Sequence, residues 1–417
     1  MAQTQRFPRI LFGMTLLLGS LPSFAQTWTS LTSGSTANLG SVHFPTAQVG
    51  YATGLNNVAA NILKTTNGGA SWAPTTNMNW TYLGLHFLNA DTGWIVGNGG
   101  DIRKTVNGGT SWINQTPVGG TDHLNAVQFV NPLVGWVALN SGGSVRKTTD
   151  GGTTWTTQSL GQSMNVYGLW FHDTLTGFTA GSQGIRKTVN GGTSWTSVSS
   201  TNLTTITFPT RAVGYAAGGL AVILKSTDSG NTWSSKFGGV FSSFNANSFH
   251  SLSCVDADRC YAAASTTGGV WRIFATLDGG ASWAVVDSGS GAGFTGKVGI
   301  HFPNASAGYF VAQGGQIRKS GAVPASLTSY EKSKTSAAPR LLRNAAIWRF
   351  DFTLEKAERY EATLTDLNGR VVWATSGRSA AGPLALNIPA QVTGRGVHVL
   401  SFRAGSTRHA LRLAATD

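Results

Sequence analysis

Short alternations of large apolar and polar residues recur along the chain and predict β-strands. In residues 41–44, for example, Val42 and Phe44 alternate with Ser41 and His43, so a strand here places its large side chains on one face. Clusters of Gly, Asn, Asp, Ser and Thr, which favour turns, separate such segments. The pattern predicts an all-β protein made of many short strands.

An eleven-residue motif recurs six times, at residues 62–72, 102–112, 145–155, 185–195, 223–233 and 273–283. The first copy reads ILKTTNGGASW, and the tryptophans that end successive copies are 40, 43, 40, 38 and 50 residues apart. A strand–turn–strand pattern such as residues 41–54 (SVHFPTAQVGYATG) precedes each copy and occurs seven times. A period of about 40 residues with four short strands is typical of a propeller blade.

The two ends of the repeat region are truncated in complementary ways. The seventh unit stops after residues 317–320 (IRKS), without the turn and the tryptophan-containing strand. Residues 26–33 (QTWTSLTS) resemble residues 193–200 (TSWTSVSS), which end the fourth copy and follow it. We therefore predict a seven-bladed β-propeller over residues 26–320, closed by an N-terminal strand, because an open solenoid gives no reason for complementary ends.

The motif also contains the residues expected to shape its turn. The Asn or Asp side chain accepts backbone N–H hydrogen bonds, and the glycines allow the positive φ angles of a hairpin. The tryptophan is expected to pack between blades. The structural residues predicted in this way are Asn67, Trp72, Asn107, Trp112, Asp150, Trp155, Asn190, Trp195, Asp228, Trp233, Asp278 and Trp283.

The first 25 residues have the features of a secretory signal peptide. Arg6 and Arg9 precede an apolar run at residues 10–21, and a small-x-small tripeptide ends at Ala25. The run is short for a bilayer span, and no later stretch approaches the required length. We expect cleavage near Ala25, export from the cytoplasm and no transmembrane segment in the mature chain.

Charge is sparse and spread along the chain. Only 11% of the residues are charged, about half the usual fraction, which argues against a charged helical bundle or a disordered chain. The net charge of +13 is not concentrated in Lys/Arg runs or a basic helix. This predicts moderate attraction to anionic surfaces and no nucleic-acid partner. No motif indicates a cofactor.

The two cysteines, Cys254 and Cys260, flank the segment VDADR in one of the predicted hairpins. In an oxidising compartment, thiols on paired strands are expected to form a disulfide. The alternative is a redox or metal-binding pair. It is weaker because the spacing is not Cys-x-x-Cys and no third ligand stands nearby.

The recurrent motif is the Asp box, S/T-x-D-x-G-x-x-W, with Asn67, Asn107 and Asn190 replacing Asp in three copies. Together with the preceding pattern F-x-x-x-x-x-G-Y/W-x-x-G, it resembles the photosystem II assembly and stability factor family of seven-bladed, BNR-like propellers over residues 26–321. The resemblance implies a non-catalytic chaperone that binds a protein partner through an arginine-rich face. Nothing in the sequence indicates a photosystem partner.

After a Ser/Ala/Pro/Lys-rich linker at residues 321–343, short alternating strands over residues 344–417 predict a small β-sandwich. The order F-x-L, A-x-L-x-D-L-N-G-R-V-V, G-V-H-V-L is similar to the C-terminal sorting domain of the type IX secretion system, although the usual Asn-Pro is missing. The resemblance implies contact with type IX secretion machinery and release from, or anchoring on, the outer surface of a Gram-negative bacterium. A generic accessory sandwich is the alternative.

Catalysis by the propeller is not expected. Sialidases share the Asp box but use a Glu-assisted tyrosine, and no Glu precedes residue 331. Other glycosidases use two placed carboxylates, and the aspartates outside the boxes and hairpin turns are Asp101, Asp122 and Asp287. A carbohydrate-binding or glycosidase-like surface propeller remains the alternative, with Trp80 and Trp271 as candidates for sugar stacking, although burial is favoured for each.

Arginines recur at one motif position in three consecutive blades and in the seventh: Arg103, Arg146, Arg186 and Arg318. They are candidates for an arc that binds an anionic ligand or a protein. The alternative is that their stems pack between blades. We weigh the two equally.

His43, His86 and His301 share an inner-strand position in three blades that become neighbours in a closed ring. We expect no shared metal ion, because equivalent positions of adjacent blades are usually too far apart. A packing role is favoured for all three.

Overall fold

The computed structural model describes residues 26–322 and 340–415, except residues 56–61, 76–77, 79, 117–121, 238–247, 267–268 and 291–295 in the first part and 344–346, 355–356, 367–370, 381, 390–395 and 405–406 in the second. The chain divides into two compact units, Met1–Ser326 and Leu327–Asp417. The signal peptide predicted at residues 1–25 and most of the predicted linker lie outside the described residues.

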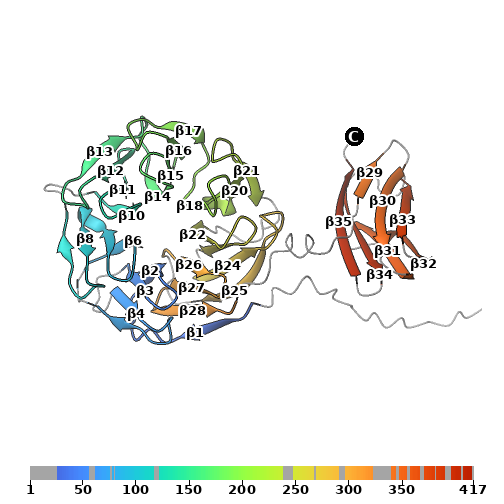
Figure 1. Cartoon of the computed structure of the whole chain (residues 1–417), viewed down its shortest axis with the longest axis horizontal. Coiled ribbons are helices and arrows are strands. Elements are labelled where there is room, and N and C mark those ends of the chain that lie inside the picture. The colour runs from blue at the N-terminus through green and yellow to red at the C-terminus, as the bar shows by residue number, and fades with distance from the viewer. Residues whose placement is uncertain are drawn as a thin grey trace, which may run out of the picture. The chain divides into compact units, whose positions relative to one another are not determined.

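The first unit consists of seven four-stranded antiparallel sheets arranged around an axis (Figure 1). Each sheet is called a blade and numbered in chain order. In the described part of the chain, the other regular segments of this unit are two 3₁₀ turns, η1 (Asn98–Gly100) and η2 (Gly219–Ala221). The all-β class and the seven four-stranded repeats predicted from the sequence are confirmed.

The strands of blades one to three are β2 (Leu39–His43), β3 (Gly50–Gly54), β4 (Ile62–Thr65), β5 (Ala73–Pro74), β6 (Tyr82–Phe87), β7 (Gly93–Gly97), β8 (Ile102–Thr105), β9 (Ile113–Asn114), β10 (Leu124–Phe129), β11 (Gly135–Leu139), β12 (Ser144–Thr148) and β13 (Thr156–Ser159). Those of blades four to six are β14 (Val166–Phe171), β15 (Gly177–Gly181), β16 (Gly184–Thr188), β17 (Thr196–Ser199), β18 (Thr205–Thr207), β19 (Gly214–Ala217), β20 (Ile223–Ser226), β21 (Ser234–Phe237), β22 (Ser248–Cys254), β23 (Cys260–Ser265), β24 (Val270–Thr276) and β25 (Ala284–Ser290). The first strand of each blade lies nearest the axis (Figure 1).

Blade seven combines segments from both ends of the repeat region. Its inner strands are β26 (Gly299–Asn304), β27 (Ala307–Ala312) and β28 (Gln316–Ser320). The outer strand is β1 (Trp28–Leu31), which pairs antiparallel with β28 so that Trp28 faces Ser320 and Leu31 faces Ile317. Trp28 packs edge-on against Phe302, with ring centroids 6.0 Å apart. It therefore makes the contact that the motif tryptophan makes in other blades.

Aromatic rings from adjacent blades stack to form the core of the ring. An aromatic residue on the second strand of one blade lies face to face with a phenylalanine on the first strand of the next, as in Trp94 and Phe129, whose centroids are 3.5 Å apart. The motif tryptophan then packs edge-on against that phenylalanine, as Trp155 does against Phe129 at 6.0 Å. The same arrangement joins Tyr51 to Phe87, Trp136 to Phe171 and Tyr309 to Phe44.

The stacked phenylalanine also explains a glycine in each first hairpin. Phe87 is the register partner of Gly93, and a Cβ at Gly93 would overlap the Phe87 ring. Blade six differs at both positions, because Cys254 and Cys260 are register partners and form a disulfide. The disulfide predicted for this pair is present, in the place that other blades give to a phenylalanine and a glycine.

The second unit contains two sheets. One has the strand order β29 (Arg340–Arg343), β30 (Ile347–Leu354), β33 (Gly382–Pro389), and the other β32 (Val371–Ser379), β31 (Glu358–Asp366), β34 (Gly396–Ala404), β35 (Thr407–Ala415). Buried Leu364, Ile388 and Phe402 belong to one hydrophobic cluster that draws on both sheets. In the described part of the whole chain, no helix is long and apolar enough to cross a membrane.

Candidate binding sites

The Asp-box turns are closed by their own side chains. In the first box, the Thr65 hydroxyl donates to Asn67 Oδ1 at 2.9 Å, while the Gly69 N–H donates to Thr65 Oγ1 at 2.9 Å. Asn67 Oδ1 also accepts the Ser71 N–H at 2.9 Å. The boxes at Asn107, Asp150, Asn190, Asp228 and Asp278 repeat these three bonds. Their polar groups therefore serve the turn.

Asp and Asn build this turn with one hydrogen bond reversed. Asp150 Oδ2 accepts the Thr154 hydroxyl proton at 2.6 Å, whereas Asn107 Nδ2 donates to Ser111 Oγ at 2.8 Å. The hydrogen bonds from Thr154 hold the pKa of the Asp150 carboxyl at about 2, and those from Thr232 do the same for Asp228. A carboxylate held in this way is a poor general acid.

Three of the four candidate arginines are ion-paired. Arg103 pairs with Asp101 at 2.8 Å, Arg146 with Asp122 at 3.0 Å and Arg318 with Asp287 at 2.9 Å. Asp101, Asp122 and Asp287 are the three aspartates that lie outside the boxes and the hairpin turns. Arg318 also donates to Ser30 Oγ and to the Trp28 carbonyl on β1. The positive charge of the predicted arc is therefore largely balanced.

Arg186, the fourth candidate, has a neutral side-chain partner. Its Nη2 donates to Gln162 Oε1, and the residue is 8% exposed. The four side chains come from equivalent third strands, as the sequence predicts, but they engage polar groups of their own or the preceding blade. This arrangement favours the packing alternative, and anion binding by the arginines stays a prediction.

The three inner-strand histidines lie together at the axis. The His43 ring centroid is 5.2 Å from that of His86 and 4.6 Å from that of His301. These ring contacts agree with the packing role favoured for the three histidines. The observed ring contacts couple blades one, two and seven.

Two of these histidines also join adjacent blades by hydrogen bonds. His301 Nδ1 accepts the Phe44 N–H at 3.2 Å, and His86 Nδ1 accepts the Phe129 N–H at 3.4 Å. A neutral imidazole with an acceptor Nδ1 carries its proton on Nε2, which leaves no lone pair for a metal ion. The described residues contain no group of three or more His, Cys, Asp or Glu side chains placed to hold a metal ion. Burial lowers the pKa of His86 and of His301 to about 4.

Lysines of the motif form a further set of contacts, here called the lysine staples. Lys147 Nζ donates to the Gly191 carbonyl in the next box at 3.0 Å and lies 5.1 Å from the Trp136 ring centroid. Lys64, Lys104, Lys187, Lys225 and Lys319 contact the boxes at Gly108, Gly151, Ser229, Gly279 and Gly68 in the same way.

The sixth motif has Ala275 in place of the lysine, and blade seven has no box to accept a bond. The missing lysine and the missing box therefore fall at the same junction, between blades six and seven. Sequence reasoning missed the staples, although the signal is present, because the third motif position is Lys in the other copies.

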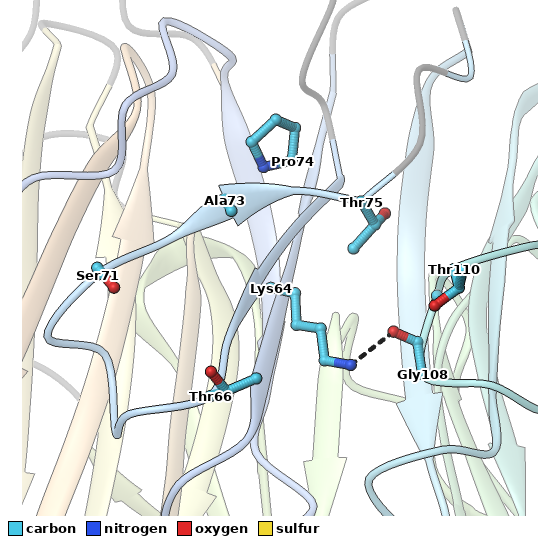
Figure 2. Close-up of a pocket in the computed structure, with 9 residues that line it drawn as sticks. Lys64, Thr66, Ser71, Ala73, Pro74, Thr75, Gly108 and Thr110 are labelled. Atoms are coloured by element: carbon cyan, nitrogen blue, oxygen red, sulfur yellow. Dashed lines mark hydrogen bonds between the residues drawn. The ribbon is translucent and has the colours of Figure 1, made fainter.

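A pocket of about 340 Å³ opens between the boxes of blades one and two (Figure 2). Lys64 lies at its base, with its Nζ donating to the Gly108 carbonyl at 2.8 Å. The pocket is lined by Lys64, Thr66, Ser71, Ala73, Pro74, Thr75, Gly108, Gly109 and Thr110. The lining combines hydroxyls, a carbonyl and one ammonium group.

The two tryptophans considered for sugar stacking differ in solvent exposure. Trp271 is buried at 2% exposure, and the Arg318 guanidinium lies 5.8 Å from its ring centroid. Trp80 is 44% exposed, so the expectation of burial is wrong for this residue. Its Nε1–H donates to the Asn98 carbonyl at 2.7 Å, and its ring packs beside Gly99, where φ is +62°. The left-handed η1 turn provides a support for an exposed ring.

The fold and the box geometry define a β-propeller built from Asp-box blades. Neither protein-family models nor curated protein sequences match the chain. Among solved structures, YCF48 bound to D1 peptide is similar with a TM-score of 0.54 and 19% identity over 70% of this chain and 96% of that one. YCF48 from Cyanidioschyzon merolae gives 0.54 and 18%, over 70% and 98%. The Niastella koreensis GH74 enzyme gives 0.57 and 14%, over 92% and 74%.

At these identities the comparisons establish the fold. The chain is therefore similar in architecture both to a propeller that binds a peptide and to an enzyme, and its own residues must distinguish the two.

Proposed function

We propose that this protein is a non-catalytic propeller that binds a protein partner at the envelope of a Gram-negative bacterium, either secreted or held on the outer surface. The likeness to YCF48 bound to D1 peptide supports a peptide or protein ligand. The signal-peptide features of residues 1–25 support export.

The proposal that the propeller is non-catalytic rests on the hydrogen bonds and ion pairs that its aspartate carboxylates make. At least eight of the ten aspartates in residues 26–321 accept a hydrogen bond from, or form an ion pair with, a neighbouring side chain. Asp101, for example, binds Arg103, the Tyr82 hydroxyl and the Thr116 hydroxyl. Glycoside hydrolysis requires two carboxyl groups that face one substrate bond. Carboxylates committed to structural bonds do not supply that pair.

We also infer two finer features of the organisation. The pairing of β1 with β28 is taken to close the propeller ring, because it completes blade seven from the opposite end of the repeat. The second unit is taken to be a β-sandwich that serves as a type IX secretion sorting domain. The shared hydrophobic cluster of its two sheets supports the first part of that inference, and the sequence resemblance at residues 344–417 supports the second.

A carbohydrate-binding surface protein is the second candidate. The exposed Trp80 ring is the observation that favours it, because sugars stack on such rings. The likeness to the GH74 enzyme is compatible with it. The two candidates differ in ligand class and in the effect of salt, since an aromatic platform is less sensitive to salt than charged contacts.

A crosslinking experiment on the full secreted chain separates the candidates. A photoreactive residue replaces either Val189, 66% exposed on the Asp-box side of the ring, or Leu220, 90% exposed in η2 on the opposite side. We expect one side to crosslink a single envelope protein, which then binds saturably when purified, while the other side serves as the matched control.

Retention of envelope polysaccharide by both forms, or release of sugars from it, would contradict a protein-binding role. A Trp80→Ala variant tests the alternative directly, because loss of that retention would assign it to the exposed ring.

A further inference from the structure

The pocket between blades one and two is best understood by comparison with the equivalent places in the next two blades. There, the residue three positions after the motif tryptophan is a glutamine. Gln115 Nε2 donates to the Gly151 carbonyl of blade three at 3.0 Å, and Gln158 Nε2 donates to the Gly191 carbonyl of blade four at 3.2 Å. Each carbonyl thus receives an amide N–H in addition to the lysine staple.

Thr75 occupies the same position in blade one. Its N–H donates to the Ile62 carbonyl at 3.0 Å, as the Gln115 N–H donates to the Ile102 carbonyl at 2.9 Å, so the two backbones are equivalent. Threonine is too short to carry an amide to the next box. Within the described residues, the Gly108 carbonyl receives the Lys64 ammonium and no second side-chain donor.

Within the described residues, the short Thr75 side chain fills only part of the space that the glutamine fills in the next two blades. A Cβ on Gly152 would overlap Gln115 Oε1, which shows that the amide lies against the second glycine of the box. At the equivalent Gly109, the nearest atom to such a Cβ is Thr75 Cγ2 at 3.2 Å. Figure 2 shows Thr75 and Lys64 on one side of the resulting pocket and Gly108 on the other.

The polar groups of the pocket select among ligands. The Gly108 carbonyl requires a donor, which a carboxylate lacks. Lys64 repels a cationic ligand, whereas its ammonium and the lining hydroxyl of Thr66 can donate to an oxygen. The Thr110 hydroxyl already donates to the Asn107 carbonyl at 3.0 Å. A primary carboxamide carries both a donor NH₂ and an acceptor oxygen. The donor half of this geometry is already present in this chain, because Gln115 Nε2 and Gln158 Nε2 donate to the equivalent box carbonyls. Gln115 Oε1 accepts from Trp94 Nε1 at 3.1 Å.

We propose that this pocket, the amide pocket, binds the primary carboxamide of a glutamine side chain from a partner polypeptide. The carboxamide NH₂ donates to the Gly108 carbonyl, and its oxygen accepts from Lys64 or a lining hydroxyl. The inference rests on the proposed protein-binding function for the source of the glutamine. The chemical preference of the pocket stands on the internal comparison alone.

Saturation-transfer NMR on the full chain tests the chemical preference, with propionamide, propionate and N-acetylglucosamine as probes. We expect saturation of propionamide at millimolar concentration and at least a tenfold weaker effect for propionate. The Thr75→Gln variant supplies its own amide, so propionamide binding should fall at least tenfold. Thr75→Ser preserves the space and should stay within twofold of the wild type.

A second variant that fills the pocket controls for a folding defect in Thr75→Gln. Thr75→Leu introduces the side chain found at the equivalent Leu31 and should abolish propionamide binding as Thr75→Gln does. Equal saturation of propionate, a response confined to N-acetylglucosamine, or propionamide binding that survives both filling variants would each overturn the proposal.

The same variants separate this proposal from the proposed function. If the partner identified by crosslinking binds Thr75→Gln with at least tenfold lower affinity than Thr75→Ser, its glutamine uses the pocket. If it binds both equally, the protein-binding function holds and the amide pocket fails as its anchor. If propionamide binds as expected but no protein partner is captured, the proposed function fails and the chemical preference of the pocket survives.

Discussion

At the level of single residues, the boxes show that one turn tolerates two hydrogen-bond polarities. The hydroxyl two residues after the second box glycine donates to Asp150 Oδ2 but accepts from Asn107 Nδ2. A hydroxyl can rotate to do either. The backbone bonds to the shared Oδ1 atom are the same in both cases, so Asp and Asn are interchangeable in shape and differ in titration.

The Asp150→Asn variant should therefore remove an acid-dependent contribution to stability. The pKa of Asp150 is about 2 in the folded chain, below its ordinary value near 3.8. Such a carboxylate stabilises the fold above about pH 4, and the contribution disappears as the pH falls toward 2. Thermal unfolding between pH 7 and pH 2 should show a smaller decline for Asp150→Asn than for the wild type. Asn107→Asp is the reciprocal control and should steepen the decline.

The buried histidines predict a second acid dependence at higher pH. His86 and His301 have a pKa of about 4 in the fold, below the ordinary 6.5, so the unfolded chain takes up protons first as the pH falls. Their stabilising contribution is complete above about pH 6.5 and is lost between there and pH 4, by roughly 3 kcal/mol for each histidine.

His86→Gln should reduce this loss while keeping the interblade bond, because Gln128 already accepts the Phe171 N–H at 2.7 Å in blade three. Denaturant unfolding at pH 7 and pH 4.5 measures the difference. Parallel pH profiles for variant and wild type would refute the assignment.

At the level of strands, side chains of each stapled blade extend to the blade that follows it in the sequence and contact it there. Lys147 reaches forward to the Gly191 carbonyl, and the aromatic residue beneath it, Trp136, stacks on Phe171 of the same following blade. Lys147 and Trp136 come from the two central strands of their blade, β12 and β11. The motif therefore encodes a junction as well as a blade.

Removing one staple should weaken the propeller measurably. Lys147→Met eliminates a charge-assisted hydrogen bond and a cation–π contact, which should lower the free energy of unfolding by about 2 kcal/mol. Ala275→Lys is the matched control, because blade seven offers no box carbonyl to accept the new ammonium. Because Ala275 is buried at 0% exposure and the new ammonium finds no acceptor, this variant should lower stability rather than raise it. A gain comparable to the loss at Lys147 would show that the staple needs no acceptor.

The sequence predicts the blades well because their signals are local. Strand alternation, the turn glycines and the tryptophan all lie within one period, so residues 62–72 alone indicate a complete box hairpin. Contacts between blades depend on connections of different length and are not readable from one period. For this reason the pairing of Asp122 with Arg146 and the exposure of Trp80 were not predicted.

At the level of the whole molecule, blade seven depends on segments almost 300 residues apart. β1 contributes the outer strand, Trp28 covers Phe302, and Ser30 accepts a hydrogen bond from Arg318. Loss of these contacts exposes an edge of β28. The stability of the propeller is thus tied to a four-residue strand near the start of its described part.

Trp28→Ala should destabilise the fold by about 2–3 kcal/mol, as expected for a partly buried tryptophan. Trp112→Ala, also partly buried and packed edge-on against Phe87 at 6.2 Å, is the matched control. Limited proteolysis should distinguish them. The Trp28 variant should be cut first near β1, because its partner β28 lies at the other end of the repeat region in the sequence. The Trp112 variant keeps β9 joined to its partner β8 by the short box turn. Identical early cleavage patterns would contradict the special role of β1.

The forward direction of the lysine staples has a consequence for how such a ring can change during evolution. Each stapled blade carries a lysine that donates to the next blade and a box carbonyl that accepts from the preceding blade. When the gene segment for such a blade is duplicated, the copy therefore carries both the donor and the acceptor that its two new junctions need. An inserted copy between two stapled blades needs no compensating mutation on either side. At the blade six and seven junction, Ala275 offers no donor and the following unit no acceptor, so a copy inserted there would join without lysine staples. The ancestry of the blades should therefore be recorded most faithfully away from that junction.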